Sequence, residues 1–442
     1  MSEKEYQVAI IGGGVCGTAL LYLLAGYTDI DDIILIEKYD AVAKVNSHGR
    51  NNSQTLHCGD IETNYTLEKA SKVKDAAEMV VNYTEQLANR DKVIFKYPKM
   101  VIAVGEQECQ LLRARFVEFK TRFTTMQLLE KEDIAQTEPN VVMIDGKLRP
   151  EPCIALAVLD EYCAVDFNQL AESFVTQALS TDKALEMSLN SHVEGISQQE
   201  GLFTIKTQNK SIRAKCVVVS AGGHSLLLAQ QMGYGLEFSC LPVAGSFYFT
   251  PKVLNGKVYT VQNDKLPFAA VHGDPDVLVD DKTRFGPTAL LLPLLERYNL
   301  STFTEFLHVL RFDRNVLKVF WDLFKVSDIR NYIFKNFLFE VPGLRRWLFL
   351  KDAQKIVPSL TLKDVEFAKG FGGVRPQLID KKESVLMLGE AKINTGKGII
   401  FNMTPSPGAS SCLVNAELDM RLIADYLDKM IDEENLQSRL HK

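Results

Sequence analysis

The sequence predicts an α/β fold in which a dinucleotide-binding domain is interrupted by insertions that form a second, mixed α+β domain. The first observation is the apolar run 8–11, which leads through a glycine-rich turn into a helix over 18–24. The second is another apolar run, 216–219, which also ends in a glycine turn. The third is a set of segments, among them 241–250, 257–261 and 268–272, that indicate strands of a separate sheet.

The first glycine turn has the G-x-G-x-x-G spacing of dinucleotide-binding proteins. Gly12 permits the tight turn, Gly14 lets the backbone approach a pyrophosphate, and Gly17 lets the helix pack on the strand. The helix N-terminus would offer N–H donors and a positive dipole to the phosphates. Glu37 ends the next apolar run and would accept from ribose hydroxyls, with Lys38 beside it. A glycine turn without a ligand is the alternative.

Charge, cysteine spacing and the N-terminus exclude several classes of protein. The formal net charge is −6, which argues against binding to nucleic acid. None of the eight cysteines forms a C-x-x-C pair, so we expect no metal site and a set of reduced, buried thiols. The chain begins with charged residues, and its long uncharged run, 6–28, contains the glycine turn. We therefore expect neither a signal peptide nor a transmembrane helix.

The segment 295–351 differs from the rest of the chain in composition. It holds nine of the 24 Phe residues and both Trp residues, together with an excess of basic over acidic residues. Phe312, Val316 and Leu323 share one face of an expected helix. Basic residues interleaved with aromatic ones are typical of helices at a lipid interface. A helical subdomain packed on its own core or on another subunit is the alternative.

Five longer motifs resemble the malate:quinone oxidoreductases, in particular the short form of Helicobacter- and Campylobacter-like bacteria, and the resemblance covers essentially the whole chain. The motifs are 52–57 (NSQTLH), 241–246 (LPVAGS), 267–274 (PFAAVHGD), 371–377 (FGGVRPQ) and 402–409 (NMTPSPGA). The resemblance implies the FAD-dependent fold of the glutathione reductase and D-amino-acid oxidase superfamily. It also implies oxidation of (S)-malate to oxaloacetate, with the electrons passed to a membrane quinone. A dehydrogenase or oxidase of L-2-hydroxyglutarate or another 2-hydroxy acid is the alternative.

The resemblance also implies how FAD and the two domains are distributed along the chain. The FAD-binding domain is expected over 1–92, 150–237 and 355–442, and the substrate or capping domain over 93–149 and 238–354. The expected FAD contacts come from the glycine turns, two strand ends and the turn before the last helix. They are Gly12, Gly14, Gly17, Glu37, Lys38, Val193, Ala221, Gly222, Thr404, Pro407, Gly408 and Ala409.

Oxidation of a 2-hydroxy acid needs a base for the hydroxyl proton and a cation for the carboxylate. His272 follows an apolar run and precedes a Gly-Asp-Pro turn, which suggests a place at the edge of a pocket. A histidine pKa of about 6.5 suits a base at neutral pH. His272 is therefore the predicted base, with His57 as the alternative base or as a hydrogen-bond donor to the flavin. Arg375 is the predicted catalytic clamp, because a guanidinium binds a carboxylate through two hydrogen bonds.

Malate carries a second carboxylate, so a second cation is expected. Arg284, Arg50 and Lys99 are the candidates, and the sequence does not discriminate between them. Tyr248, on the expected strand 241–250, is either a hydrogen-bond donor to the substrate or a core aromatic residue.

These features together predict a peripheral flavoenzyme on the cytoplasmic face of the bacterial inner membrane. The expected partners are (S)-malate, a membrane quinone and the membrane surface. The segment 295–351 is the candidate docking surface, because a quinone dissolved in lipid needs a route to the flavin. The alternatives are an oxidase that passes electrons to oxygen and a binding protein without activity, which would require a decayed glycine fingerprint.

Overall fold

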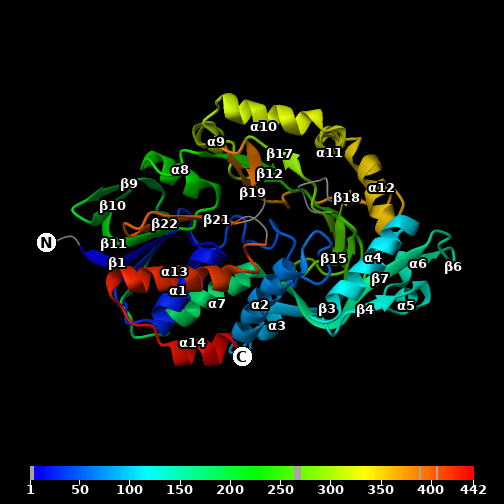
Figure 1. Ribbon diagram of the computed structural model, residues 1–442, viewed down its shortest axis with the longest axis horizontal. Coiled ribbons are helices and arrows are strands. Elements are labelled where there is room, and N and C mark those ends of the chain that lie inside the picture. The colour runs from blue at the N-terminus through cyan, green and yellow to red at the C-terminus, as the bar shows by residue number, and fades with distance from the viewer. Residues whose placement is uncertain (1–3, 263–269, 388–389, 405–406) are drawn as a thin grey trace.

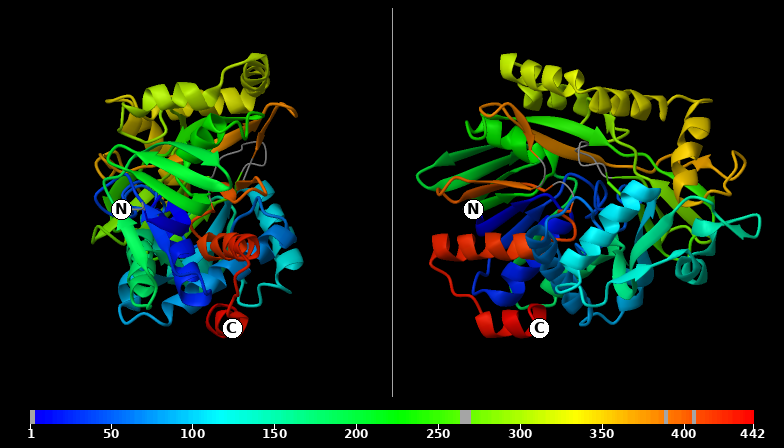
Figure 2. Two further views of the ribbon diagram at one scale, coloured as in Figure 1. Left: turned by 90° about the vertical axis from the view of Figure 1, so that its left-hand side faces the viewer. Right: turned by 45° about the vertical axis from the view of Figure 1, so that its right-hand side comes forward.

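The computed structural model describes residues 4–262, 270–387, 390–404 and 407–442 and confirms the expected α/β class. Two eight-stranded sheets and one four-stranded sheet carry the fold. In Figure 1 the first strand, in blue, lies close to the C-terminal helices, in red, and a row of yellow and orange helices lies along the opposite edge. Both views of Figure 2 show that row on the outside of the molecule.

The first sheet has a parallel centre. Its strand order is β21 (Ala391–Asn394), β22 (Ile399–Met403), β11 (Ser211–Val219), β1 (Glu5–Ile11), β2 (Ile33–Ile36) and β8 (Leu185–Ser188), while β10 (Leu202–Thr207) and β9 (Val193–Gln199) extend from β11. β1 runs parallel to both β2 and β11, and Ile11 pairs with Ile36 and with Val219. Both glycine turns therefore leave the sheet at the same carboxyl edge.

Helices cover both faces of this sheet, as a parallel sheet requires. One face packs against α1 (Val15–Tyr27), α2 (Leu67–Thr84), α7 (Phe167–Leu179), α13 (Cys412–Leu427) and α14 (Glu433–Leu440). The other packs against α8 (Gly223–Gln231), and α9 (Thr302–Leu310) and α10 (Arg314–Lys325) continue the same hydrophobic core further out, with α9 against α8 and β12. The Asp166 side chain caps α7, because it accepts hydrogen bonds from the N–H groups of Asn168 and Gln169.

The other two sheets lie beside the first. The four-stranded sheet has the order β17 (Leu290–Leu291), β12 (Phe238–Ala244), β19 (Val374–Asp380) and β20 (Val385–Met387). The second eight-stranded sheet has the order β18 (Glu366–Phe367), β13 (Tyr248–Pro251), β16 (Lys282–Gly286), β15 (His272–Pro275), β14 (Lys257–Thr260), β3 (Ile94–Val104), β7 (Cys153–Val165) and β4 (Gln127–Leu129). The remaining elements are α3 (Arg90–Val93), α4 (Glu106–Phe119), α5 (Lys131–Thr137), α6 (Pro139–Val142), β5 (Met143–Ile144), β6 (Lys147–Leu148), α11 (Ser327–Leu338) and α12 (Arg345–Ile356).

Two expected strands differ from the structure. The strand expected over 241–250 is divided into β12 and β13, which belong to different sheets. The break falls at Gly245, where an added Cβ would lie 2.8 Å from Cβ of Pro287. The strand expected over 268–272 instead begins at His272, so the Gly-Asp-Pro sequence lies in β15 and forms no turn. Residues 268–269 lie outside the described part of the chain.

Candidate active site

A cavity of about 330 Å³ lies at the carboxyl edge of the parallel sheet, between the two glycine turns. Gly12 has a φ of +107°, and an added Cβ would lie 2.5 Å from the carbonyl oxygen of Ser220. A Cβ on Gly17 would lie 2.0 Å from the carbonyl oxygen of Gly12. Only glycine fits both positions, and the bare backbone leaves room for a pyrophosphate between the turns.

Most of the expected FAD contacts meet at this cavity. Nine of them line it: Gly12, Gly14, Glu37, Lys38, Val193, Ala221, Gly222, Thr404 and Ala409. Gly17 lies beneath the turn, where it lets α1 approach β1. The carbonyl of Gly408 accepts from the Cys16 thiol at 3.6 Å, and the carbonyl of Pro407 accepts from the N–H of Ser410 at 2.7 Å. Both residues therefore hold the turn that leads into α13.

Glu37 lies where a ribose would be recognised. Its carboxylate accepts hydrogen bonds from the N–H groups of Gly13 at 2.7 Å and Tyr39 at 3.0 Å. Burial raises the pKa of Glu37, while these two N–H groups lower it. The glycine cradle, the cavity and this acceptor together fit FAD, and the lining includes both Glu37 and, from the C-terminal part of the chain, Thr404 and Ala409.

The sequence prediction missed the acidic residues that reach this cavity from the segment 295–351. Glu296 forms an ion pair with Lys38 and accepts from the Tyr39 hydroxyl at 2.5 Å. Glu305 on α9 lies 2.9 Å from Nε2 of His224, and both residues line the cavity. The sequence carried no specific signal for these two residues, because the same basic segment contains other acids.

The two histidines expected at the catalytic centre each lie against a carboxylate. His272 begins β15, is 3% exposed, and has Nδ1 2.6 Å from Oδ2 of Asp274. His57 has Nδ1 2.7 Å from Oε1 of Glu62, and its backbone N–H donates to Ser410 at 2.9 Å. Burial lowers the pKa of His272 and Asp274 raises it. In both rings the carboxylate engages Nδ1, so Nε2 is the atom that faces other partners.

Arg375 lies on β19, opposite Val243 of β12. Among the residues that the structure describes, no carboxylate pairs with it. Burial lowers the pKa of its guanidinium, and interactions with the hydroxyls of Tyr332 and Tyr259 raise it. Tyr259 also stacks on the imidazole of His272. Arg375 is half-buried, and a cation without a carboxylate partner among the described residues is suited to a substrate carboxylate.

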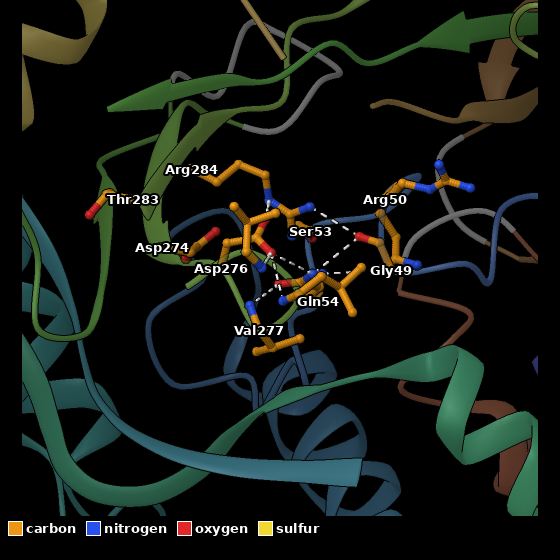
Figure 3. Close-up of polar contacts among 12 residues, drawn as sticks. Gly49, Arg50, Ser53, Gln54, Asp274, Asp276, Val277, Thr283 and Arg284 are labelled. Atoms are coloured by element: carbon orange, nitrogen blue, oxygen red, sulfur yellow. Dashed lines mark hydrogen bonds and ion pairs between the residues drawn. The ribbon is translucent and has the colours of Figure 1, made fainter. Parts of the chain in front are cut away.

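Two of the expected second cations already have carboxylate partners. Nε of Arg284 lies 3.2 Å from Oδ2 of Asp276, and its Nη1 donates to the carbonyl of Gly49 at 3.0 Å (Figure 3). Nζ of Lys99 lies 2.8 Å from Oδ2 of Asp60, and a second carboxylate, of Glu161, lies 2.5 Å away. Arg284 thus connects Asp276 with the loop at Gly49. The third candidate, Arg50, is exposed and has no carboxylate partner within the described ranges.

Tyr248 lies in the core of the second sheet. Its hydroxyl donates to the carbonyl of Phe339 at 2.8 Å, and its ring stacks on Phe349 with centroids 3.9 Å apart. These contacts match the core-aromatic alternative.

Two further searches concern metal ions and membrane spans. Among the described residues, no group of three or more His, Cys, Asp or Glu side chains is arranged to hold a metal ion. No helix in the same ranges is long and apolar enough to cross a bilayer.

A glycine cradle that fits FAD on a parallel sheet, next to two further sheets of which one carries His272 and the other Arg375, is the arrangement of an FAD-dependent oxidoreductase. The FAD-bound L-α-glycerophosphate oxidase of Mycoplasma pneumoniae has the same fold, with a TM-score of 0.65 and 20% identity, covering 97% of this chain and 96% of that one. A family model described as "Malate:quinone oxidoreductase (Mqo)" matches residues 4–442, and the chain belongs to this family.

Two relatives show how close the similarity is. A probable malate:quinone oxidoreductase of Campylobacter jejuni is 51% identical over 447 residues, covering 100% of both chains. A malate:quinone oxidoreductase of Helicobacter pylori is 46% identical, covering 99% of this chain and 98% of that one. The chain is therefore an FAD-dependent enzyme that oxidises malate to oxaloacetate with a quinone as electron acceptor.

Proposed function

We propose that His272 is the base and Arg375 the carboxylate clamp of this malate oxidation, and that the enzyme works docked on the cytoplasmic face of the inner membrane. The observation that carries the proposal is the position of Tyr259, whose ring stacks on His272 and which is also among the groups that act electrostatically on Arg375. A base and a cation close to one side chain suit a 2-hydroxy acid, whose hydroxyl and carboxylate are on adjacent carbons.

Bound FAD supplies the acceptor for the hydride from C2 of malate and carries the electrons to the quinone. The residues of this chain prepare that step. Arg375 binds the carboxylate and so orients the substrate, and Nε2 of His272 accepts the hydroxyl proton. His57, on the loop that contacts Ser410 near the start of α13, is proposed as the hydrogen-bond donor to the flavin. The cradle residues Gly12 and Glu37 hold the adenosine half.

The surface of α9–α12 supports docking on a lipid bilayer. Phe312 and Trp321 are 62% and 63% exposed, and Phe334 and Trp347 are 63% and 52% exposed. Exposed basic residues lie between them: Arg311, Arg314, Lys318, Lys325, Arg330, Lys335, Arg346 and Lys351. Aromatic rings enter the headgroup region and basic side chains attract anionic lipids, which are abundant on the cytoplasmic leaflet. Figure 1 shows these helices as one continuous row.

The test is rapid mixing of the oxidised holoenzyme with (S)-malate, followed by the loss of flavin absorbance. We expect His272→Gln to slow flavin reduction by about 10²-fold or more while the FAD content is unchanged. Full speed in that variant would contradict the base role, and His57→Gln then identifies the alternative. A panel that includes (S)-2-hydroxyglutarate, with a quinone analogue or oxygen as acceptor, separates the malate enzyme from its alternatives.

A further inference from the structure

Five buried side chains form a closed ring that contains His272. Oδ2 of Asp274 lies 2.6 Å from Nδ1 of His272, and Oδ1 of Asp274 lies 3.2 Å from Nζ of Lys257. Lys257 donates to the hydroxyl of Thr55 at 3.1 Å, and that hydroxyl is 2.9 Å from the hydroxyl of Tyr259. The Tyr259 ring closes the circle, because it stacks on His272 with centroids 4.3 Å apart and planes 13° apart. All five residues are at most 8% exposed.

The ring settles which imidazole nitrogen holds a proton. Burial raises the pKa of Asp274, but His272 and Lys257 outweigh burial and bring it to about 2. An ionised carboxylate can only accept, so the proton between the two groups is on Nδ1 of the imidazole. Nε2 then carries the lone pair that a base needs.

The charges of the ring act on His272 in opposite directions. The negative charge of Asp274 favours an additional proton on the imidazole, and the positive charge of Lys257 opposes it. Further titratable groups act on members of the ring. His57 acts on His272, Arg284 acts on Asp274, and Glu62, Cys163 and Arg375 interact with Tyr259. Burying the charges of Asp274 and Lys257 costs desolvation free energy, which offsets their mutual attraction. The ring therefore contributes little to the free energy of folding.

We propose that Asp274 and Lys257 are positioning residues, which fix Nε2 of His272 as the proton-accepting atom and set how tightly it holds the proton. The inference rests on the proposed role of His272 as the base. Thr55, on the loop that also carries His57, links the ring to the flavin side of the site. The pairing of β14 with β15 and the hydrogen bonds of Thr55 thus fix the positions of the side chains around the imidazole.

The test is the pH dependence of flavin reduction by malate in the holoenzyme, measured by rapid mixing. A base works when it is deprotonated, so the rate rises as the pH passes the pKa of His272. Asp274→Asn removes the charge that favours the imidazolium, and the acid limb moves to lower pH. Lys257→Met removes the opposing charge, and the limb moves to higher pH. We expect each shift to be about one pH unit or more.

The controls separate charge from structure. Lys257→Arg keeps the charge and should restore the wild-type limb. Glu138→Gln removes another buried carboxylate, which accepts from the N–H groups of Asn255 and Gly256 just before β14, and should leave the limb unmoved. The ionisation of malate is common to every variant, so only differences between variants count.

Shifts of the same sign in Asp274→Asn and Lys257→Met, or no shift with normal FAD content, would overturn the inference. If Asp274→Asn does not fold, the pair Lys257→Met and Lys257→Arg decides alone. An active His272→Gln enzyme would instead refute the base role on which the inference rests.

Discussion

Arg375 illustrates how one unpaired charge can mark a substrate site. Buried arginines normally pair with carboxylates, as Arg284 does with Asp276. Arg375 is half-buried and has no carboxylate partner among the described residues, and Tyr332, Tyr259 and Tyr65 are the groups that act on its charge. A substrate carboxylate would complete the pairing that the protein leaves open.

The first prediction at this scale concerns the loss of that pairing. Arg375→Met should raise the malate concentration for half-maximal flavin reduction by about 10²-fold, because a charge-assisted bidentate contact contributes roughly 1.5–3 kcal/mol. Arg375→Lys should recover part of the loss, because it keeps the charge but not the planar fork. The half-maximal malate concentration of each variant is measured from the rate of flavin reduction at increasing malate. Arg213→Met is the matched control on an exposed arginine of β11, and an equal effect there would count against the clamp.

Some site residues could be assigned from the sequence alone, and others could not. The cradle glycines follow from local backbone requirements, so Gly12 and Gly17 could be assigned from spacing alone. Asp274, Lys257 and Glu305 could not, because their partners are distant in sequence and are set by strand pairing and helix docking.

Helix α9 shows how one element connects the cofactor cavity with the outer helices. The inner side of α9 brings Glu305 to His224. Glu296, which precedes the helix and also lines the cavity, pairs with Lys38 just after β2. Its outer side carries Phe303 and Leu307, which are 44% and 50% exposed. These two ionic contacts fasten the segment 295–310 across the adenosine end of the cavity.

Removing the contacts of Glu296 with Lys38 and of Glu305 with His224 should speed the dissociation of FAD. We expect the double variant Glu296→Gln and Glu305→Gln to release FAD about tenfold faster, which corresponds to roughly 1.4 kcal/mol. The measurement is the rise of flavin fluorescence after dilution of the holoenzyme. Glu194→Gln is the control, because Glu194 lines the same cavity but pairs with Lys206 on β10. Equal release from the control and the double variant would argue against the fastening.

Strand positions were the weaker part of the element predictions. The helices α2 and α7 carry local signals in the sequence, namely an apolar face at helical spacing and a capping side chain at the first turn. The apolar run before His272 resembled a strand, yet β15 begins only at His272, where β14 and β16 provide partners. Likewise the run 241–250 had the composition of one strand but is shared between two sheets, because Gly245 packs against Pro287. Pairing partners decide such boundaries, and a single sequence does not show them.

In the whole molecule the proposed docking surface and the proposed substrate site share one helix. α11 directs Tyr332 and Asn336 inward, where Oδ1 of Asn336 accepts from the N–H of Ala289 at 2.7 Å and Tyr332 interacts with Arg375. The same helix presents Phe334 and Phe337 outward, 63% and 56% exposed. A quinone that remains in lipid would therefore approach to within one helix of the site.

The last prediction tests docking itself. Arg314→Glu with Lys318→Glu reverses two exposed charges on α10, beside Trp321, and should move the holoenzyme from anionic vesicles to the supernatant, because each basic residue near the surface contributes about 1 kcal/mol. Lys206→Glu with Lys215→Glu makes the same charge change on β10 and β11, away from the outer helices, and should leave partitioning intact. Flavin reduction by malate should be unchanged in both proteins, because neither pair lines the cavity. If both double variants weaken vesicle binding equally, the attraction depends only on net charge, and the outer helices are not the docking surface. If neither double variant weakens it, the outer helices pack against protein instead of lipid.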